Sequence, residues 1–256
     1  MPKRDNAPMG APCWVDLASS DTDRSRAFYC PLFGWDAEEP NAEFGGYFNF
    51  AKDGVLLAGC MASRPDAPVT DAWAVYLATD DAHKTVEAAG ANGGQVVVPP
   101  MEIGDLGTMA VVLDRGGAAI GVWQPGLHRG FGIQGEPDTP GWFELQTKDY
   151  AGAVDFYRDV FRWETRVASD TPELRYTVQA HGDEQLAGIM DASGFLPEAA
   201  PAHWSVYFTV ADTDATLAKA VDLGGSVVMD PEDTPYGRLA VAADANGAQF
   251  KLAAGG

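Results

Sequence analysis

Two acidic residues, Asp16 and Glu144, occupy matching positions in this sequence. Each follows a tryptophan by two residues, in the segments Trp14–Leu17 and Trp142–Leu145. Both segments alternate like β-strands, in which residues two apart point to the same face. A carboxylate on an inward face needs a partner there. It could accept a hydrogen bond from a ligand, act as a base or supply one oxygen to a metal.

Aromatic side chains share the predicted inward faces with these carboxylates. Aromatic walls favour flat, partly apolar ligands through stacking, and a few polar groups then fix the ligand's orientation. The alternative is that these large rings only fill the core of each sheet. No catalytic residue is assigned. The predicted ligand-binding residues are Trp14, Asp16, Tyr76, Trp123, Trp142, Glu144, Tyr207 and Lys251.

The segments that carry these residues belong to a repeated sequence. The segment Ala27–Trp35 returns as Asp155–Trp163, with its Phe, Tyr and Trp residues at the same spacing. The segment Leu57–Met61 returns as Leu186–Met190. Two homologous domains therefore fill the chain. We expect an N-terminal tail over 1–10, a first domain over 11–126, a linker over 127–140 and a second domain over 141–256.

Each domain contains two shorter units with the same order of elements. A strand of alternating apolar residues leads to an Asp at a helix N-cap position, and a helix and several short strands follow. The N-cap candidates are Asp21, Asp81, Asp149 and Asp212. The pattern predicts four βαβββ modules, with enough residues in each domain to bury its own core. Loops at 103–108 and 233–238 are expected at the cavity rims, where they could act as lids.

This arrangement resembles the vicinal oxygen chelate superfamily, which includes glyoxalase I, extradiol dioxygenases, fosfomycin-resistance transferases and bleomycin-binding proteins. The resemblance is carried by the four modules and by the Phe-Tyr pair that precedes Phe33–Trp35 and Phe161–Trp163. It covers about residues 11–254 and looks closest to actinobacterial two-domain members described as glyoxalase-like or hydroxylase-like. It implies an α+β fold, in which the modules pair into two cupped, partly open mixed-sheet domains with one cavity each.

The resemblance also implies where a metal would be bound. Metal-dependent members carry His, Glu or Gln on the first strand of a module and often Glu on the last. The matching positions in this chain are Trp14, Ala74, Trp142, Ser205, Gly121 and Lys251. None of these residues is a good ligand: tryptophan offers only an N–H donor, glycine has no side chain, and lysine is a cation at neutral pH. We therefore predict no metal and no cofactor; the minority alternative is a metal held by Asp16, Glu144 and His203.

The composition of the chain limits its possible binding partners and its location in the cell. The net charge of −20, from 37 acidic and 17 basic residues, disfavours nucleic acid and anionic lipid as partners. No apolar run is long enough to span a membrane, and Met1–Ala11 lacks a signal-peptide core, so we expect a cytoplasmic protein. The three cysteines, Cys13, Cys30 and Cys60, fit reduced thiols.

These features predict a metal-independent protein whose aromatic-lined cavities bind a small molecule, a planar aromatic metabolite or antibiotic, for sequestration or self-resistance. The alternative is a glyoxalase-like or hydroxylase-like tailoring enzyme of secondary metabolism. We expect a monomer or a homodimer, because two fused domains already supply the pairing that single-domain relatives obtain by dimerising. Metal analysis and a test for turnover of the methylglyoxal–glutathione adduct would separate the two functions.

Overall fold

The computed structural model describes residues 7–63 and 71–254. Residues 1–6 of the expected tail, and all but the ends of a loop expected at 62–71, lie outside this range. The first domain contains β1 (Pro12–Ser19), α1 (Thr22–Phe33), β2 (Asp36–Ala37), the short 3-10 helix η1 (Ala42–Phe44), β3 (Phe48–Lys52), β4 (Val55–Ala62), β5 (Ala72–Ala78), α2 (Ala82–Ala91), β6 (Gln95–Ile103), β7 (Gly107–Leu113) and β8 (Ala119–Pro125).

The second domain repeats this order of strands and helices. It contains β9 (Thr139–Thr147), α3 (Tyr150–Phe161), β10 (Glu164–Asp170), β11 (Arg175–His181), β12 (Glu184–Asp191), β13 (His203–Val210), α4 (Thr213–Asp222), β14 (Ser226–Thr234), β15 (Gly237–Ala243) and β16 (Gln249–Ala254). Each domain forms one eight-stranded sheet, in the order β2-β3-β4-β1-β5-β8-β7-β6 or β10-β11-β12-β9-β13-β16-β15-β14. The sheets are mixed and open, so the α+β fold of four βαβββ modules is confirmed.

The predicted N-cap aspartates all begin helices. In α1, α2, α3 and α4 the carboxylate accepts a hydrogen bond from the backbone N–H three residues later. Helix α1 then ends at Gly34 in a left-handed conformation, which glycine adopts without a side-chain clash. Helix α3 ends at Arg162 in the same conformation, and Arg162 is one of three non-glycine residues of the described chain with positive φ.

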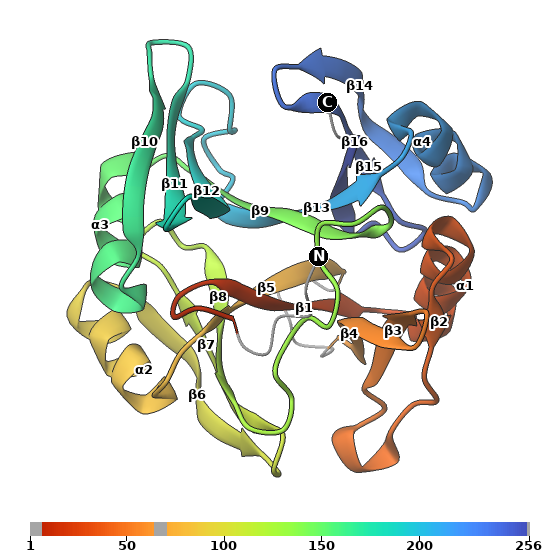
Figure 1. Cartoon of the computed structure of the whole chain (residues 1–256), viewed down its shortest axis with the longest axis horizontal. Helices are drawn as coiled ribbons and strands as arrows, with labels where there is room; N and C mark the ends of the chain where they lie inside the picture. Colours follow the sequence, from red (N-terminus) through yellow and green to blue (C-terminus); the bar gives the residue numbers. More distant parts are fainter. Residues whose placement is uncertain (1–6, 64–70, 255–256) are drawn as a thin grey trace.

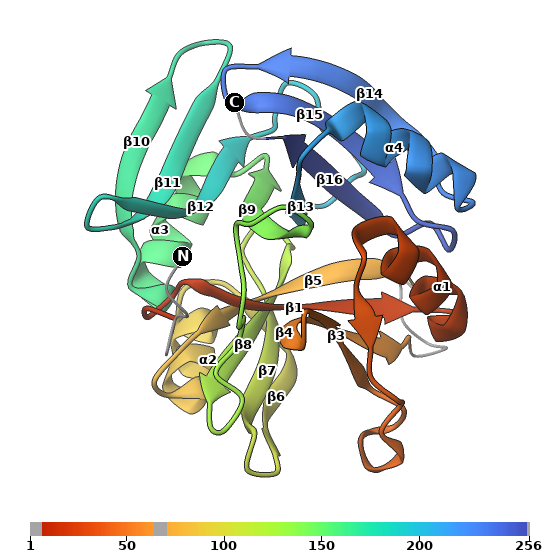
Figure 2. The same ribbon diagram turned by 45° about the vertical axis from the view of Figure 1, so that its right-hand side comes forward.

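The convex faces of the two sheets lie against each other. Figures 1 and 2 show β1 and β5 next to β9 and β13, with α1 and α4 together on one side and α2 and α3 together on the other. Phe33 of α1 packs on Phe208 of β13, with ring centroids 5.0 Å apart. The prediction that each domain buries a core of its own is therefore wrong. The convex face of each sheet stays partly uncovered by its own helices, and the other domain buries the rest.

Polar contacts also join the two domains. Trp35 Nε1 donates to the carbonyl oxygen of Asp138 at 2.7 Å, and Trp163 Nε1 donates to that of Gly10 at 2.8 Å. The buried hydroxyl of Tyr157 donates to Asp114 Oδ2 at 3.1 Å. These contacts hold the convex faces together and leave the two concave faces pointing away from each other.

Strand β6 lies at the edge of the first sheet and runs from Gln95 through two prolines to Ile103. Proline is tolerated there because β6 lies at the sheet edge, where one side of the strand forms no ladder. The expected 103–108 loop is therefore a tight hairpin between β6 and β7. Among the described residues, no helix has the length and apolar composition needed to cross a membrane.

Candidate functional site

The concave face of the second domain gathers three predicted residues from neighbouring strands. Glu144 lies on β9, Tyr207 on β13 and Lys251 on β16, and these strands are adjacent in the sheet. Lys251 Nζ lies 2.9 Å from Glu144 Oε1 and 2.9 Å from the Tyr207 hydroxyl oxygen. The Tyr207 hydroxyl donates to Glu144 Oε1 at 2.9 Å. An ammonium, a carboxylate and a phenol thus form one closed network.

Two further donors complete the environment of Glu144. The Tyr176 hydroxyl on β11 donates to Glu144 Oε2 at 3.1 Å, and Gln146 Nε2 donates to Oε1 at 3.1 Å. Trp142 Nε1 in turn donates to the Tyr176 hydroxyl at 2.9 Å. Burial first, and then the charge of Glu144, raise the pKa of Tyr176 and of Tyr207, so both phenols stay protonated donors at neutral pH.

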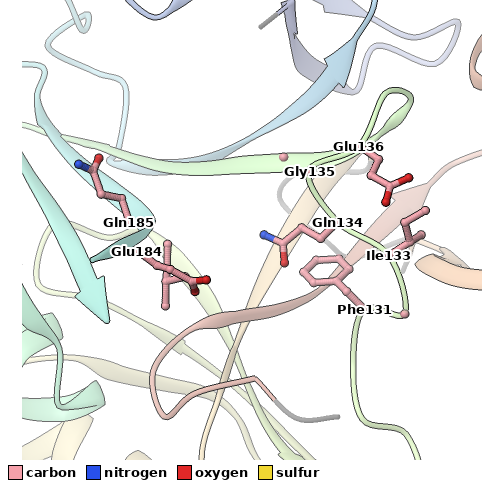
Figure 3. A pocket seen from close by; sticks show the side chains of 10 residues that line it. Phe131, Ile133, Gln134, Gly135, Glu136, Glu184 and Gln185 are labelled. Atoms are coloured by element: carbon pink, nitrogen blue, oxygen red, sulfur yellow. The ribbon is translucent and has the colours of Figure 1, made fainter. Parts of the chain in front are cut away.

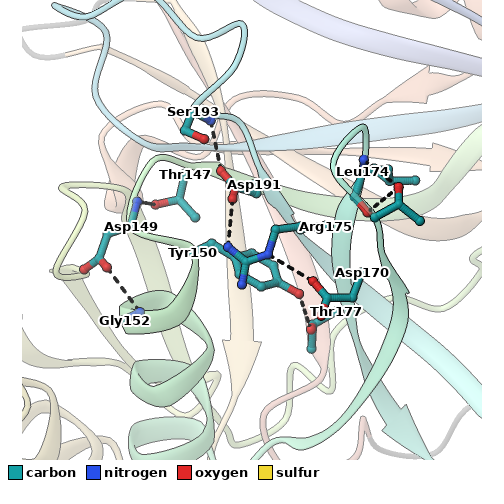
Figure 4. Close-up of polar contacts among 11 residues, drawn as sticks. Thr147, Asp149, Tyr150, Gly152, Asp170, Leu174, Arg175, Thr177, Asp191 and Ser193 are labelled. Carbon is teal, nitrogen blue, oxygen red and sulfur yellow. Dashed lines mark hydrogen bonds and ion pairs between the residues drawn. The ribbon is translucent and has the colours of Figure 1, made fainter.

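Contacts at the start of β11 fix the strand that carries Tyr176 (Figure 4). Arg175 lies 3.1 Å from Asp170 at the end of β10 and 3.2 Å from Asp191 at the end of β12. Its guanidinium also lies over the Tyr150 ring, 4.5 Å from the centroid. The Tyr150 hydroxyl is hydrogen-bonded to Thr177 at 2.6 Å. Helix α3 and three strands therefore hold the rim beside the Glu144 network.

The first domain repeats the carboxylate but not the lysine. Asp16 Oδ1 accepts hydrogen bonds from Trp14 Nε1 and from the Tyr47 hydroxyl, both at 2.9 Å. The Tyr76 hydroxyl also stabilises the carboxylate. Burial raises the pKa of Asp16 from 3.8 to about 6, and the hydrogen bonds, that from Tyr47 first, oppose this rise.

Gly121 occupies the position of Lys251 in the first domain, in the same register opposite Tyr76. A Cβ at Gly121 would overlap the Tyr76 ring, so the ring fills the space that a side chain would need. Among the described residues, no cation contributes to the pKa of Asp16. The two concave faces therefore share a geometry and differ in charge.

The linker covers part of the first concave face. The His128 ring lies edge-on to Trp14, with centroids 4.4 Å apart, and 5.4 Å from the Trp123 ring. Trp123 Nε1 donates to the carbonyl oxygen of His128 at 3.0 Å. Phe131 of the linker lies between Trp14 and Phe143. Trp14 and Trp123 therefore pack against the linker.

Four contributors are missing from the predicted ligand-binding residues: Tyr47, Tyr176, Gln146 and His128. Tyr47 and Tyr176 hold the two carboxylates, and their common spacing of 129 residues, equal to that of Leu57 and Leu186, is a signal that could have identified them. His128 lies in the linker and has no counterpart in the repeat. No pattern in the sequence marks its contact with Trp14.

A separate pocket of about 270 Å³ lies outside both concave faces (Figure 3). It is bounded by the linker, including Phe131 and Gln134, and by Glu184 and Gln185 at the start of β12. None of the predicted site residues lines it.

The positions that would bind a metal do not fit one. In the second domain Lys251 Nζ is already paired with Glu144, and in the first domain Gly121 offers no side chain. Across residues 7–63 and 71–254, no three His, Cys, Asp or Glu side chains are grouped as metal ligands would be. The side chains that contact each carboxylate donate N–H and O–H hydrogen bonds to it, and among the described residues they add no second carboxylate, imidazole or thiolate as a ligand.

Comparison with known proteins identifies the family. A sequence model described as the Glyoxalase/Bleomycin resistance protein/Dioxygenase superfamily matches residues 13–122 and 139–252. The "Anthracycline biosynthesis protein DnrV" of Streptomyces peucetius is 39% identical over 261 residues, which cover 95% of this chain and 92% of that protein.

A mycobacterial protein and a solved structure extend this comparison. The "Putative glyoxylase CFP32" of Mycobacterium tuberculosis is 37% identical over 257 residues, covering 98% of this chain and 97% of that protein. The crystal structure of the Mn(II)-bound glyoxalase from Novosphingobium aromaticivorans has a similar fold, with a TM-score of 0.65 at 14% identity over 96% of this chain and 82% of that one. The chain therefore belongs to the glyoxalase/bleomycin resistance protein/dioxygenase superfamily.

Proposed function

We propose that this protein is a tailoring enzyme of secondary metabolism that transfers protons on a planar polycyclic ketone or phenol at the concave face of the second domain. The observation that carries this proposal is the Lys251–Glu144–Tyr207 network on the concave face of the second domain. An ammonium group and a phenol can stabilise a developing oxyanion, as a metal would do by other means.

The network has the groups needed for an enolisation, in which a proton moves from carbon to Glu144. The carbonyl oxygen of the ligand would accept hydrogen bonds from Lys251 and Tyr207, which frees an oxygen of Glu144. Glu144 would then take a proton from the carbon beside the carbonyl. The electron pair of that C–H bond becomes the C=C bond of the enolate, and the carbonyl oxygen takes the negative charge. Reprotonation at another atom gives an isomer of the ligand.

The relatives favour secondary metabolism and a planar ligand. DnrV is named for anthracycline biosynthesis, and anthracyclines are planar polycyclic ketones and phenols. The rings of Trp142, Tyr176 and Tyr207 surround Glu144 and suit such a ligand. The net charge of −20 disfavours nucleic acid, and we place the activity in the cytoplasm, in a monomer or homodimer without a cofactor.

Deuterium exchange tests this proposal. The probe is 1-oxo-1,2,3,4-tetrahydroanthracene in D₂O, with loss of the proton signal beside the carbonyl followed by NMR. The protein should accelerate exchange over buffer, and Lys251→Met should lose about 100-fold of that acceleration, as loss of an acid–base group does. Tyr207→Phe should also lower it, whereas Tyr76→Phe, the matched change in the first domain, should not. Exchange no faster than in buffer would contradict the proposal.

Sequestration is the second candidate function, and the aromatic side chains Trp142, Tyr176 and Tyr207 on the same face favour it. A protein that binds planar ketones stoichiometrically without accelerating exchange would be a metal-independent binding protein. Its role would then be sequestration of, or self-resistance to, a planar metabolite or antibiotic.

A further inference from the structure

The first domain holds a buried carboxylate, Asp16, whose charge no cation of the described residues balances. Asp16 is 6% exposed, and its hydrogen-bond partners are the neutral donors Trp14 and Tyr47. In the second domain the equivalent Glu144 is paired with Lys251 at 2.9 Å. A buried anion without a cation is costly, and a structure that keeps one gains when a ligand supplies the positive charge.

The concave face beside Asp16 is open to solvent. Ala74 lies directly opposite Asp16 in the antiparallel β1–β5 pair and is exposed. Residues opposite each other in such a pair have side chains on the same face, with Cβ atoms about 5 Å apart. Met61 on the neighbouring strand β4 is half-buried. A group that enters over Ala74 therefore reaches the carboxylate without moving the linker.

Aromatic rings surround this carboxylate. Trp14, Tyr47 and Tyr76 all contact Asp16. Rings of this kind attract a cation through their π faces, and the half-buried Tyr47 provides a surface for an aromatic body. The buried Nε2 of His128, whose ring contacts Trp14, has no hydrogen-bond partner within the described chain.

We propose that the concave face of the first domain is a separate binding site, which takes the protonated amino group of a planar aromatic amine at Asp16. The site is distinct from the proposed catalytic face, because the two concave faces point away from each other. It does not depend on the proposed function of the second domain. An ammonium group at Asp16 would supply the positive charge that Lys251 supplies beside Glu144.

A pair of probes that differ in one group tests the site by calorimetry. The amine probe is 2-(1-naphthyl)ethylamine, and the neutral control is 2-(1-naphthyl)ethanol. At pH 7.5 the amine should bind one equivalent saturably, at least tenfold more tightly than the alcohol. Asp16→Asn should reduce the amine affinity at least tenfold, whereas Glu144→Gln in the second domain should not change it. Equal affinities for the two probes, no binding of the amine, or a loss only in Glu144→Gln would each overturn the proposal.

A second pair of variants avoids altering the buried carboxylate. Ala74→Lys places an ammonium group within reach of Asp16, and it should abolish amine binding by occupying the site. Ala74→Gln has a neutral side chain that also extends over the face, and it should retain most of the affinity. Because Ala74 is exposed, both variants should fold. Equal loss in both variants would mean that bulk rather than charge excludes the amine, and would overturn the role of Asp16.

The pH dependence gives a third readout. Since the pKa of Asp16 is about 6, lowering the pH from 7.5 to 5 should weaken amine binding about tenfold in the unaltered protein. The other titratable groups that contact or face this carboxylate are Tyr47, Tyr76, Cys13 and Cys60, and burial raises the pKa of each, so all stay neutral in this range. Asp16→Asn should show no such dependence, which separates Asp16 from His128, whose pKa burial lowers.

Discussion

Replacing Asp16 with Asn should change stability in a pH-dependent way. The free energy of unfolding of the variant, relative to that of the unaltered protein, should be larger at neutral pH than at acidic pH. The pKa of Asp16 rises from 3.8 to about 6 in the folded protein, so the folded state binds this proton more tightly than the unfolded state. The stability that protonation provides is complete below pH 3.8 and is lost as the pH rises through 6. The full loss is about 3 kcal/mol, because each unit of the difference between pKa 3.8 and about 6 corresponds to about 1.4 kcal/mol.

Asparagine removes this dependence while keeping the shape of the side chain. Of the full change, about 1.4 kcal/mol falls between pH 5 and pH 8. The free energy of unfolding of Asp16→Asn, minus that of the unaltered protein, should therefore be about 1.4 kcal/mol larger at pH 8 than at pH 5. Urea unfolding followed by tryptophan fluorescence and circular dichroism at both pH values measures it.

The comparison of two pH values cancels any pH-independent cost of the new amide group. An unchanged difference between pH 5 and pH 8 would show that Asp16 ionises as easily in the fold as in water. The same result would remove the argument that its charge lacks a partner.

Three further predictions follow from the same contacts. Lys251→Met leaves Glu144 buried without its cation and should lower the free energy of unfolding by about 3 kcal/mol, and Glu144→Gln added to it should restore part of that loss in a double-mutant cycle. Gly59→Ala would push a Cβ into Asp16 and Tyr47 and should cost about 1–3 kcal/mol in urea unfolding, whereas Gly90→Ala, with open space around it, should not destabilise. His128→Ala should lower the free energy of unfolding by about 1 kcal/mol and shift tryptophan emission to longer wavelength, because Trp14 and Trp123 lose a ring contact. Unchanged emission would contradict the packing of the linker on these rings.

Much of the fold could be predicted because the repeat constrains it. Strand alternation placed Trp14 and Asp16 on one face, and the structure joins them by a hydrogen bond. The same alternation brought Tyr207 and Lys251 to Glu144 from two other strands. Local rules succeed here because the period of a strand decides which face a side chain takes, whatever it later contacts.

Contacts between distant segments could not be predicted in this way. Neither the packing of Phe33 on Phe208 nor that of His128 on Trp14 has a local signal in the sequence. Lys251 was excluded as a metal ligand because of its charge, but its pairing with Glu144 depends on the parallel register of β13 and β16. Periodicity within each strand does not specify that register.

A crystal structure with bound 1,4-dihydroxyanthraquinone would show whether the Glu144 network is the functional site. We expect the ligand on the concave face of the second domain, with an oxygen within hydrogen-bond distance of Lys251 Nζ or the Tyr207 hydroxyl, and its rings against Trp142 or Tyr176. A ligand bound only elsewhere, such as in the pocket between the linker and β12, would contradict the assignment of the Glu144 network as the functional site.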